Sequence, residues 1–205
     1  MDQISNGNST ETASSDILAF LNGAASDVAP QLLGCILERT LKNGTVLRGK
    51  IVETEAYDQT DAASHSYKGK TPRTEIMFGS SGRLYVYFTY GMHYCCNVVT
   101  GPIGNGAAVL IRALEPLLGQ EDMELRRSHH GRDLTNGPAK LCQALVIDSS
   151  LNGQDLHIPP LKLMVPLRRD KVETVQTTRI GISTAKDVPW RFYYANNPYV
   201  SKVHG

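Results

Sequence analysis

Alternation of hydrophobic and polar positions is the dominant pattern in the middle of the chain. Segments of this kind are rich in β-branched and aromatic residues, and glycine or asparagine separates several of them, which is typical of strands joined by turns. We therefore predict a sheet with hairpins. Its strands are expected at Thr45–Tyr57, Leu84–Tyr90, His93–Val99 and Ala107–Leu114, and later at Leu161–Pro166, Thr178–Ile182 and Trp190–Tyr194.

Helical spacing of apolar residues occurs mainly around this predicted sheet. Ile17, Leu18 and Leu21 indicate a short helix, and Leu32, Leu33, Ile36 and Leu37 indicate another over Val28–Leu41. A proline near the first turn favours helices at Glu115–Arg127 and, after Gly137-Pro138, at Ala139–Leu145. Helices and strands together predict a mixed α/β (α+β) fold.

Residues 1–14 are rich in Ser, Thr, Asn, Asp and Glu and contain little to bury. Such composition predicts a disordered lead. The remaining residues, 15–205, are enough for one globular domain with a sizeable core.

Composition limits the kinds of partner and site. A formal net charge of +1 provides no general attraction to a polyanion. Local basic clusters remain candidates for nucleic-acid binding, although solvated surface charge explains each one equally well. The first cluster comprises Lys68, Lys70, Arg73 and Arg83, and the second comprises Arg126, Arg127, His129, His130 and Arg132.

The four cysteines, Cys35, Cys95, Cys96 and Cys142, are too few for a disulfide scaffold and lack the spacing of a zinc site. We expect reduced thiols and no metal. The chain shows neither a signal-peptide pattern nor a run of apolar residues long enough for a membrane span. We therefore expect an intracellular protein without membrane association.

Two glutamates share one face of the strand expected at Thr45–Tyr57. The two-residue period places Ile51, Glu53, Glu55 and Tyr57 on that face, with the two glutamate Cα atoms about 6.7 Å apart. Repulsion between the carboxylates can raise the pKa of one of them and make it a general base. Two ordinary glutamates on a solvent-facing strand fit the same pattern, and the strand alone does not choose between Glu53 and Glu55.

A tyrosine-rich hairpin is expected around Gly91. Tyr85 and Tyr87 fall on one strand face, whereas Tyr90 stands beside the glycine at the turn. An aromatic side chain that projects from a hairpin tip can wedge between stacked bases. Core packing is the alternative, and we favour it for Tyr85.

Arg112 lies within the apolar run Val109–Leu114, where an unpaired guanidinium would be costly. It therefore requires an acidic partner or a polar ligand. Glu55 or Glu53 is the expected one, and a structural ion pair with Glu115 is the alternative. His65 and His93 are each ambiguous alone, because satisfied structural histidines are commoner than catalytic ones.

Together these segments resemble the alkyladenine DNA glycosylases, also called 3-methyladenine or methylpurine DNA glycosylases. The resemblance extends from about Leu32 to Ser201. Its markers are Arg48–Tyr57, Ala62–Ser66, Thr71–Thr74 with Met77-Phe78, Tyr85–Tyr87, Tyr90–Met92, Leu110–Pro116, Asn136–Leu141, Arg179–Ile182 and Trp190–Phe192. Many ordered matches are far more specific than any one of them.

The resemblance implies a role for each candidate site residue. Glu55 would be the general base that activates the attacking water, and Arg112 would help to hold both the Glu55 carboxylate and that water. Tyr57, His65 and Tyr87 would stack the extracted base, Asn97 would discriminate against the 2-amino group of guanine, and Tyr90 would fill the gap in the duplex. The implied fold has a curved antiparallel sheet, flanking helices and a protruding β-hairpin.

This resemblance predicts a monofunctional base excision repair enzyme. It would remove 3-methyladenine, 7-methylguanine, hypoxanthine or ethenoadenine from double-stranded DNA without a cofactor, as a monomer, in the nucleus or a prokaryotic cytoplasm. Two alternatives remain from the residues alone. One is a catalytically silent module that binds damaged DNA, and the other is a carbohydrate hydrolase that uses Glu53 and Glu55 as its paired carboxylates.

Overall fold

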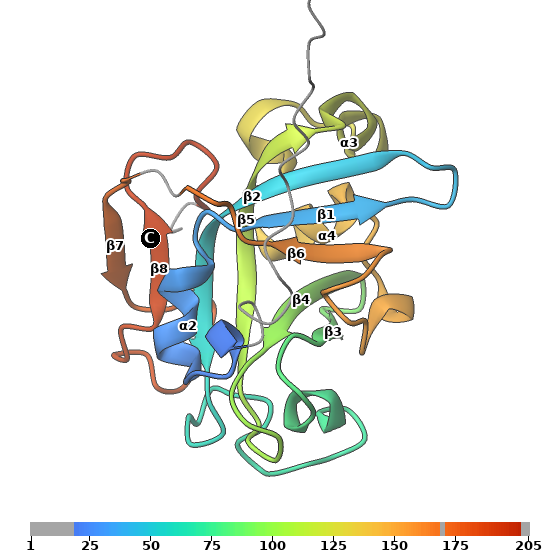
Figure 1. Cartoon of the computed structure of the whole chain (residues 1–205). Helices are drawn as coiled ribbons and strands as arrows, with labels where there is room; N and C mark the ends of the chain where they lie inside the picture. The colour runs from blue at the N-terminus through green and yellow to red at the C-terminus, as the bar shows by residue number, and fades with distance from the viewer. Residues whose placement is uncertain (1–18, 169–170, 202–205) are drawn as a thin grey trace, which may run out of the picture.

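The computed structural model describes residues 19–168 and 171–201, which form a mixed α/β domain around one curved sheet (Figure 1). Six of the eight strands follow one another in the order β3-β4-β5-β2-β1-β6, while β8 pairs with β2 and with β7, and all pairs are antiparallel. The predicted fold class is confirmed. The strands are β1 (Ile36–Thr40), β2 (Val46–Tyr57), β3 (Leu84–Thr89), β4 (His93–Val99), β5 (Ala108–Leu118), β6 (Leu161–Met164), β7 (Thr174–Thr177) and β8 (Arg191–Tyr194).

Strand β2 is the centre of the sheet. It pairs with β5 along most of its length, with β1 over Val46–Lys50 and with β8 over Glu53–Glu55. Residues 51–56 are all buried, because neighbouring strands and packed helices enclose this half of β2. The carboxylates predicted on β2 therefore lie inside the protein, which rules out the solvent-facing strand considered as their alternative.

The pairing of β2 with β5 is irregular next to these carboxylates. The register passes from Ile51 opposite Leu114 to Glu53 opposite Ala113, and then to Thr54 opposite Ile111. Arg112 is thus an extra residue on β5. Such bulges redirect side chains, and here the side chain of Arg112 reaches both glutamates of β2.

In addition to helical residues 19–21, three α-helices and three short 3-10 helices accompany the sheet in the described residues. Helix α2 (Ala25–Leu32) packs on β2, where Thr54 donates a hydrogen bond to the Ala29 carbonyl oxygen, and α4 (Pro138–Ala144) packs on β4 and β5. Helix α3 (Gln120–Arg127) lies against α4. The 3-10 helices are η1 (Glu75–Phe78), η2 (Gly131–Leu134) and η3 (Ser149–Leu151).

The helix predicted over Val28–Leu41 is wrong beyond Leu32. The chain turns at Gly34, whose φ is +84°, and continues as β1 between β2 and β6. Leu37 is buried on β1, and Glu38 binds Arg48 and Lys162 on the two neighbouring strands. Cross-strand pairing therefore overrides the helical spacing of the leucines in this segment.

Two further predictions need correction. The helix expected over Glu115–Arg127 begins only at Gln120, because the first four residues of that segment extend β5 alongside β2. Thr178–Ile182 is not a strand, since β7 ends at Thr177 and a loop follows it. The disordered lead expected at residues 1–14 lies outside the described residues, as does most of the helix expected near Ile17.

All four cysteines are buried and free. No helix in the described part of the chain is both long enough and apolar enough to cross a membrane.

We expect Gly119→Ala to lower the free energy of unfolding by roughly 2 to 4 kcal/mol. Gly119 separates β5 from α3 at a φ of +76°, and an added Cβ would lie 3.1 Å from the Val46 carbonyl oxygen and against Leu47. Gly44→Ala is the matched control, because Gly44 has a φ of +85° but no atom near its would-be Cβ. Urea denaturation of both variants separates crowding from backbone strain, and equal losses would contradict the crowding.

Candidate active site

A cavity of about 460 Å³ opens between the end of β2, the β3–β4 hairpin and the loop after β7. This volume suits a small molecule or one nucleobase. The lining side chains are mainly aromatic and polar. They include Tyr57, His65, Met77, Tyr85, Tyr87, Tyr90, Cys95, Asn97, Leu110, Arg112 and residues 180–184.

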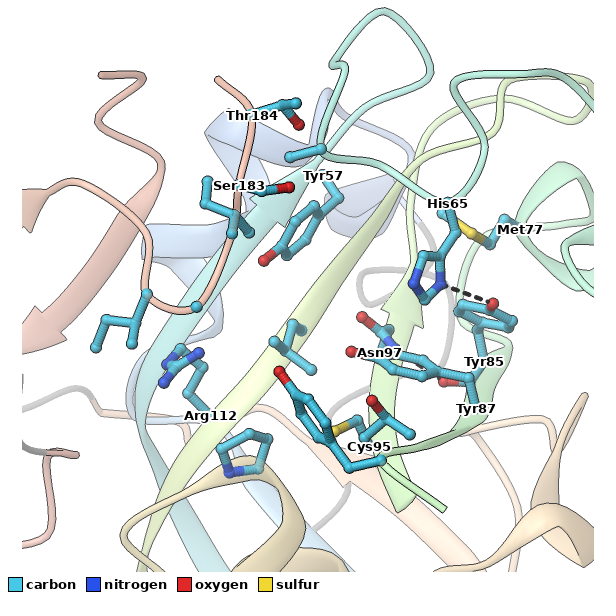
Figure 2. Close-up of a pocket in the computed structure, with 18 of the residues that line it drawn as sticks. Tyr57, His65, Met77, Tyr85, Tyr87, Cys95, Asn97, Arg112, Ser183 and Thr184 are labelled. Atoms are coloured by element: carbon cyan, nitrogen blue, oxygen red, sulfur yellow. Dashed lines mark hydrogen bonds between the residues drawn. The ribbon is translucent and has the colours of Figure 1, made fainter. Parts of the chain in front are cut away.

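Aromatic rings stand on two sides of this cavity. Figure 2 shows Tyr57 on one side and His65 with Tyr87 on the other. The rings of His65 and Tyr87 meet edge to face with centroids 4.5 Å apart. The ring of Tyr85 packs next to that of Tyr87, with a centroid distance of 5.7 Å. The structure thus brings together the three side chains predicted to stack a base, around a space that a flat ring can enter.

Asn97 projects from β4 among these aromatic residues (Figure 2). Its Nδ2 donates a 3.1 Å hydrogen bond to the Tyr85 carbonyl oxygen, which fixes the orientation of the amide. The amide oxygen is the remaining polar atom of a side chain that lines the cavity. It can accept a hydrogen bond from a ligand, or exclude one by contact.

Glu55 lies directly behind the cavity wall. Its carboxylate has no exposed surface and accepts hydrogen bonds from the Tyr57 hydroxyl at 2.8 Å and from the Ile180 amide at 2.7 Å. Arg112 Nη1 lies 3.2 Å from Glu55 Oε2. Tyr57, Ile180 and Arg112 all line the cavity, so one layer of side chains and backbone separates the carboxylate from it.

Burial, and then the Glu55 carboxylate, raise the pKa of Tyr57 well above its ordinary value. Its hydroxyl therefore remains a hydrogen-bond donor to Glu55 throughout the physiological range. Burial alone would lower the pKa of Arg112, but Glu55 and Glu53 raise it. Arg112 is therefore a permanent cation beside both carboxylates.

Glu53 is held differently from Glu55. Its carboxylate receives Arg112 Nε at 3.0 Å, Arg191 Nε at 2.7 Å, and the amide and hydroxyl of Ser201 at 2.7 and 2.8 Å. Neither of its oxygens faces the cavity, since Glu53 is fully buried and absent from the lining. Glu53 is thus the centre of a buried ion-pair network.

Arg112 pairs with both candidate carboxylates, as expected. The alternative partner, Glu115, instead binds Lys50 Nζ at 3.0 Å and Asn197 Nδ2 at 2.9 Å.

Tyr90 occupies the tip of the β3–β4 hairpin. It has a φ of +51° next to Gly91 at +67°, and 83% of its surface is exposed although it also borders the cavity. An aromatic ring on such a tip is available to an outside partner.

The predicted basic clusters are partly neutralised. In the first, Lys70 binds Glu75, Arg83 binds Asp155, and Arg73 lies 5.8 Å from the centroid of the Tyr87 ring. In the second, Arg126 binds Asp122, Arg127 donates to the Leu134 carbonyl oxygen, and His130 contacts Glu124. Among the described contacts of these two clusters, the one with the aromatic wall is made by Arg73.

Sequence reasoning missed the backbone that closes the site. Ile180 supplies an amide to Glu55, and Arg179 beside it binds Asp61. Both residues belong to the segment Thr178–Ile182, for which the sequence pattern predicts a strand. The available signal in the sequence was an arginine followed by apolar and small residues, but the partner of Arg179 lies 118 positions away along the chain.

Among the described residues, no group of three or more His, Cys, Asp or Glu side chains is arranged to hold a metal ion.

An aromatic slot with a buried carboxylate and arginine behind it can receive a flat ring next to a group that can accept a proton. Residues 19–198 match the family model described as Methylpurine-DNA glycosylase (MPG). This chain therefore belongs to the methylpurine-DNA glycosylase family, and the predicted enzyme class, a DNA glycosylase, is confirmed.

Relatives from three organisms carry a name that fits this family. A protein of Carboxydothermus hydrogenoformans is 56% identical over 85% of this chain and 92% of its own length. Proteins of Francisella tularensis strain SCHU S4 and Methanoculleus marisnigri are 50% and 46% identical, each over 90% of this chain and 97% of their own length. All three carry the name "Putative 3-methyladenine DNA glycosylase".

We expect the His65 imidazole to titrate near pH 4. Burial against the aromatic wall, and then the positive charge of Arg73, lower its pKa from 6.5 to about 4. A two-dimensional NMR titration of the imidazole measures this value directly, and Arg73→Gln should raise it. A midpoint at or above 6.5 would contradict this environment.

The same shift has a consequence for stability. Because the folded-state pKa lies below the ordinary value, the unfolded chain binds this proton more tightly. The contribution of neutral His65 to the free energy of unfolding is therefore fully present above pH 6.5, and it is lost as the pH falls from 6.5 towards 4.

Proposed function

We propose that this protein extracts an alkylated or deaminated purine from double-stranded DNA and hydrolyses its N-glycosidic bond, leaving an abasic site. The observation that carries the proposal is the slot between Tyr57 and the His65–Tyr87 wall, with Glu55 and Arg112 directly behind it. The names of the relatives support 3-methyladenine as one substrate. We add 7-methylguanine, hypoxanthine and ethenoadenine, which are purines of similar shape.

Entry of a base into this slot requires the nucleotide to leave the duplex. That step costs a few kcal/mol because stacking and pairing are lost. Tyr90 stands exposed at the hairpin tip on the border of the cavity, so we propose that its ring fills the vacated position. Stacking against the neighbouring bases would offset part of the cost.

Inside the slot the base would stack between Tyr57 and the His65–Tyr87 wall. Electron-rich rings attract a positively charged purine more strongly than a neutral one. We propose that Asn97 disfavours unmodified guanine, because its 2-amino group would crowd the side chain that Tyr85 holds in place, whereas the positive charge of 7-methylguanine offsets this cost in the slot. Selection would thus combine ring charge with the shape of one edge of the base.

Glu55 is the residue that we assign to water activation. It would accept a proton from a water molecule whose oxygen bonds to C1′ while the N-glycosidic bond breaks and its electron pair leaves with the base. The negative charge also favours the positive character that develops on the sugar. Since Glu55 has no exposed surface, the water would reach it from the part of the cavity bordered by Arg112 and Ile180.

Glu53 suits this role poorly, because two arginines and Ser201 already bind its carboxylate. The same contacts argue against a carbohydrate hydrolase in which Glu53 and Glu55 act as a pair. We assign Glu53 to holding Arg112.

We expect Glu55→Gln to reduce excision by at least about 100-fold, because the amide cannot accept the proton from water. Excision is measured as alkali-sensitive strand breaks in duplexes that contain hypoxanthine or a methylated purine. Unchanged circular dichroism would show that the fold persists.

Glu53→Gln is the matched control, because Glu53 lies two residues before Glu55 on the same strand. This substitution should lower the free energy of unfolding by about 3 to 5 kcal/mol, since it weakens a buried ion-pair network. The molecules that remain folded should still excise the damaged base. Loss of excision only in Glu53→Gln would reverse the two assignments. No breaks even with the unaltered protein would leave the silent DNA-binding module as the better description.

We expect Tyr90→Ala to weaken binding to a lesion duplex by roughly 5- to 150-fold, which corresponds to the loss of one stacking contact. Glu55→Gln should bind nearly as well as the unaltered protein, and Tyr90→Phe should retain the stacking. Fluorescence anisotropy with a labelled hypoxanthine duplex measures all three. Equal losses in Tyr90→Ala and Glu55→Gln would show that these roles are wrongly divided.

A further inference from the structure

A buried arginine lies against the ring of Tyr57. The Cζ atom of Arg179 is 4.8 Å from the centroid of that ring and 5.4 Å from the centroid of the Trp190 ring. Arg179 is buried and does not belong to the described residues that line the cavity, whereas Tyr57 does. The guanidinium therefore occupies the face of Tyr57 that is turned away from the slot.

Asp61 supplies the countercharge. Both of its carboxylate oxygens bind the terminal nitrogens of Arg179, with Oδ1 at 3.0 Å from Nη2. Arg179 also donates to the Ala56 carbonyl oxygen at 2.9 Å. The side chains of this pair are almost completely buried, so water screens their charges poorly.

Both faces of an aromatic ring carry negative potential and attract cations. A positively charged purine stacked on the slot side of Tyr57 would share that ring with the Arg179 guanidinium on the other side. The two positive charges repel each other through a region of low dielectric, while a neutral purine experiences no such net repulsion. The charge behind Tyr57 thus acts selectively on the charge of the base.

We propose that the Arg179–Asp61 pair is a specificity-determining positioning element that sets the preference of the slot for cationic over neutral purines. The proposal rests on the function proposed above. Asp61 compensates the guanidinium and so permits cationic bases, and Arg179 limits how strongly they are favoured. Neither residue lines the cavity, so both would act on the base through the ring of Tyr57.

Arg179 has a second effect that must be separated from this one. It precedes Ile180, whose amide binds Glu55 at 2.7 Å, so a change at Arg179 disturbs the catalytic carboxylate as well. That disturbance slows excision of every base. It cancels in the ratio of two excision rates measured with the same variant.

The test compares single-turnover excision of 7-methylguanine, which is cationic, with that of hypoxanthine, which is neutral, in duplexes of the same sequence. Asp61→Asn leaves the buried cation uncompensated and should lower the ratio of these rates about tenfold. Arg179→Gln removes the cation and should raise the ratio about threefold or more. A purely structural role would slow both reactions without moving the ratio in opposite directions.

Asp58→Asn is the matched control, because it removes a carboxylate from the same loop, where Asp58 binds Thr60. Its ratio should equal that of the unaltered protein. The double variant Asp61→Asn/Arg179→Gln leaves no unpaired buried charge, so it should be more stable than either single variant. It can therefore be measured if a single variant is too unstable to purify. Its ratio should lie above that of Asp61→Asn and below that of Arg179→Gln.

Ratios that all stay within about twofold of the unaltered protein would overturn the inference. A variant too slow to measure is compared instead by equilibrium binding of the two duplexes in a Glu55→Gln background, with the same order expected. If the unaltered protein excises neither base, the proposed function fails instead, so the two failures are distinguishable.

Discussion

The carboxylate of Glu53 holds together the parts of the chain on which the site depends. It lies on β2 and binds Arg112 from β5, Arg191 from β8 and Ser201 near the end of the described chain. Two guanidinium groups buried in a protein interior require such compensation. Because Arg112 also reaches Glu55, the ion pairs that join three strands fix the position of the carboxylate behind the cavity.

Local pattern was sufficient for much of the sheet. The alternation along β2 and the tyrosine-rich hairpin of β3 and β4 gave their positions within a residue or so, and the resemblance to the family chose Glu55 over Glu53 as the base. The segment after Leu32 was misassigned, because its leucines have helical spacing while its partners on β2 and β6 are remote in sequence.

The same physical reason explains what was missing from the predicted site. The resemblance to the family names six side chains for the site, and all six line the cavity. They are Tyr57, His65, Tyr87, Tyr90, Asn97 and Arg112. The Ile180 amide and the contact of Arg179 with Asp61 involve pairs separated by more than a hundred residues, and a backbone donor leaves no trace in residue type. Contacts of this kind follow only from the completed fold.

The two sides of the cavity come from different kinds of structure. Glu55 and Arg112 stand on paired strands, whereas His65 and residues 180–184 belong to loops. Loops accept insertions and substitutions that strands in the middle of a sheet do not. Evolution or design can therefore reshape what this cavity admits without moving the groups to which we assign the hydrolysis. On this assignment, the range of accepted bases and the chemical step are separable traits of one small domain.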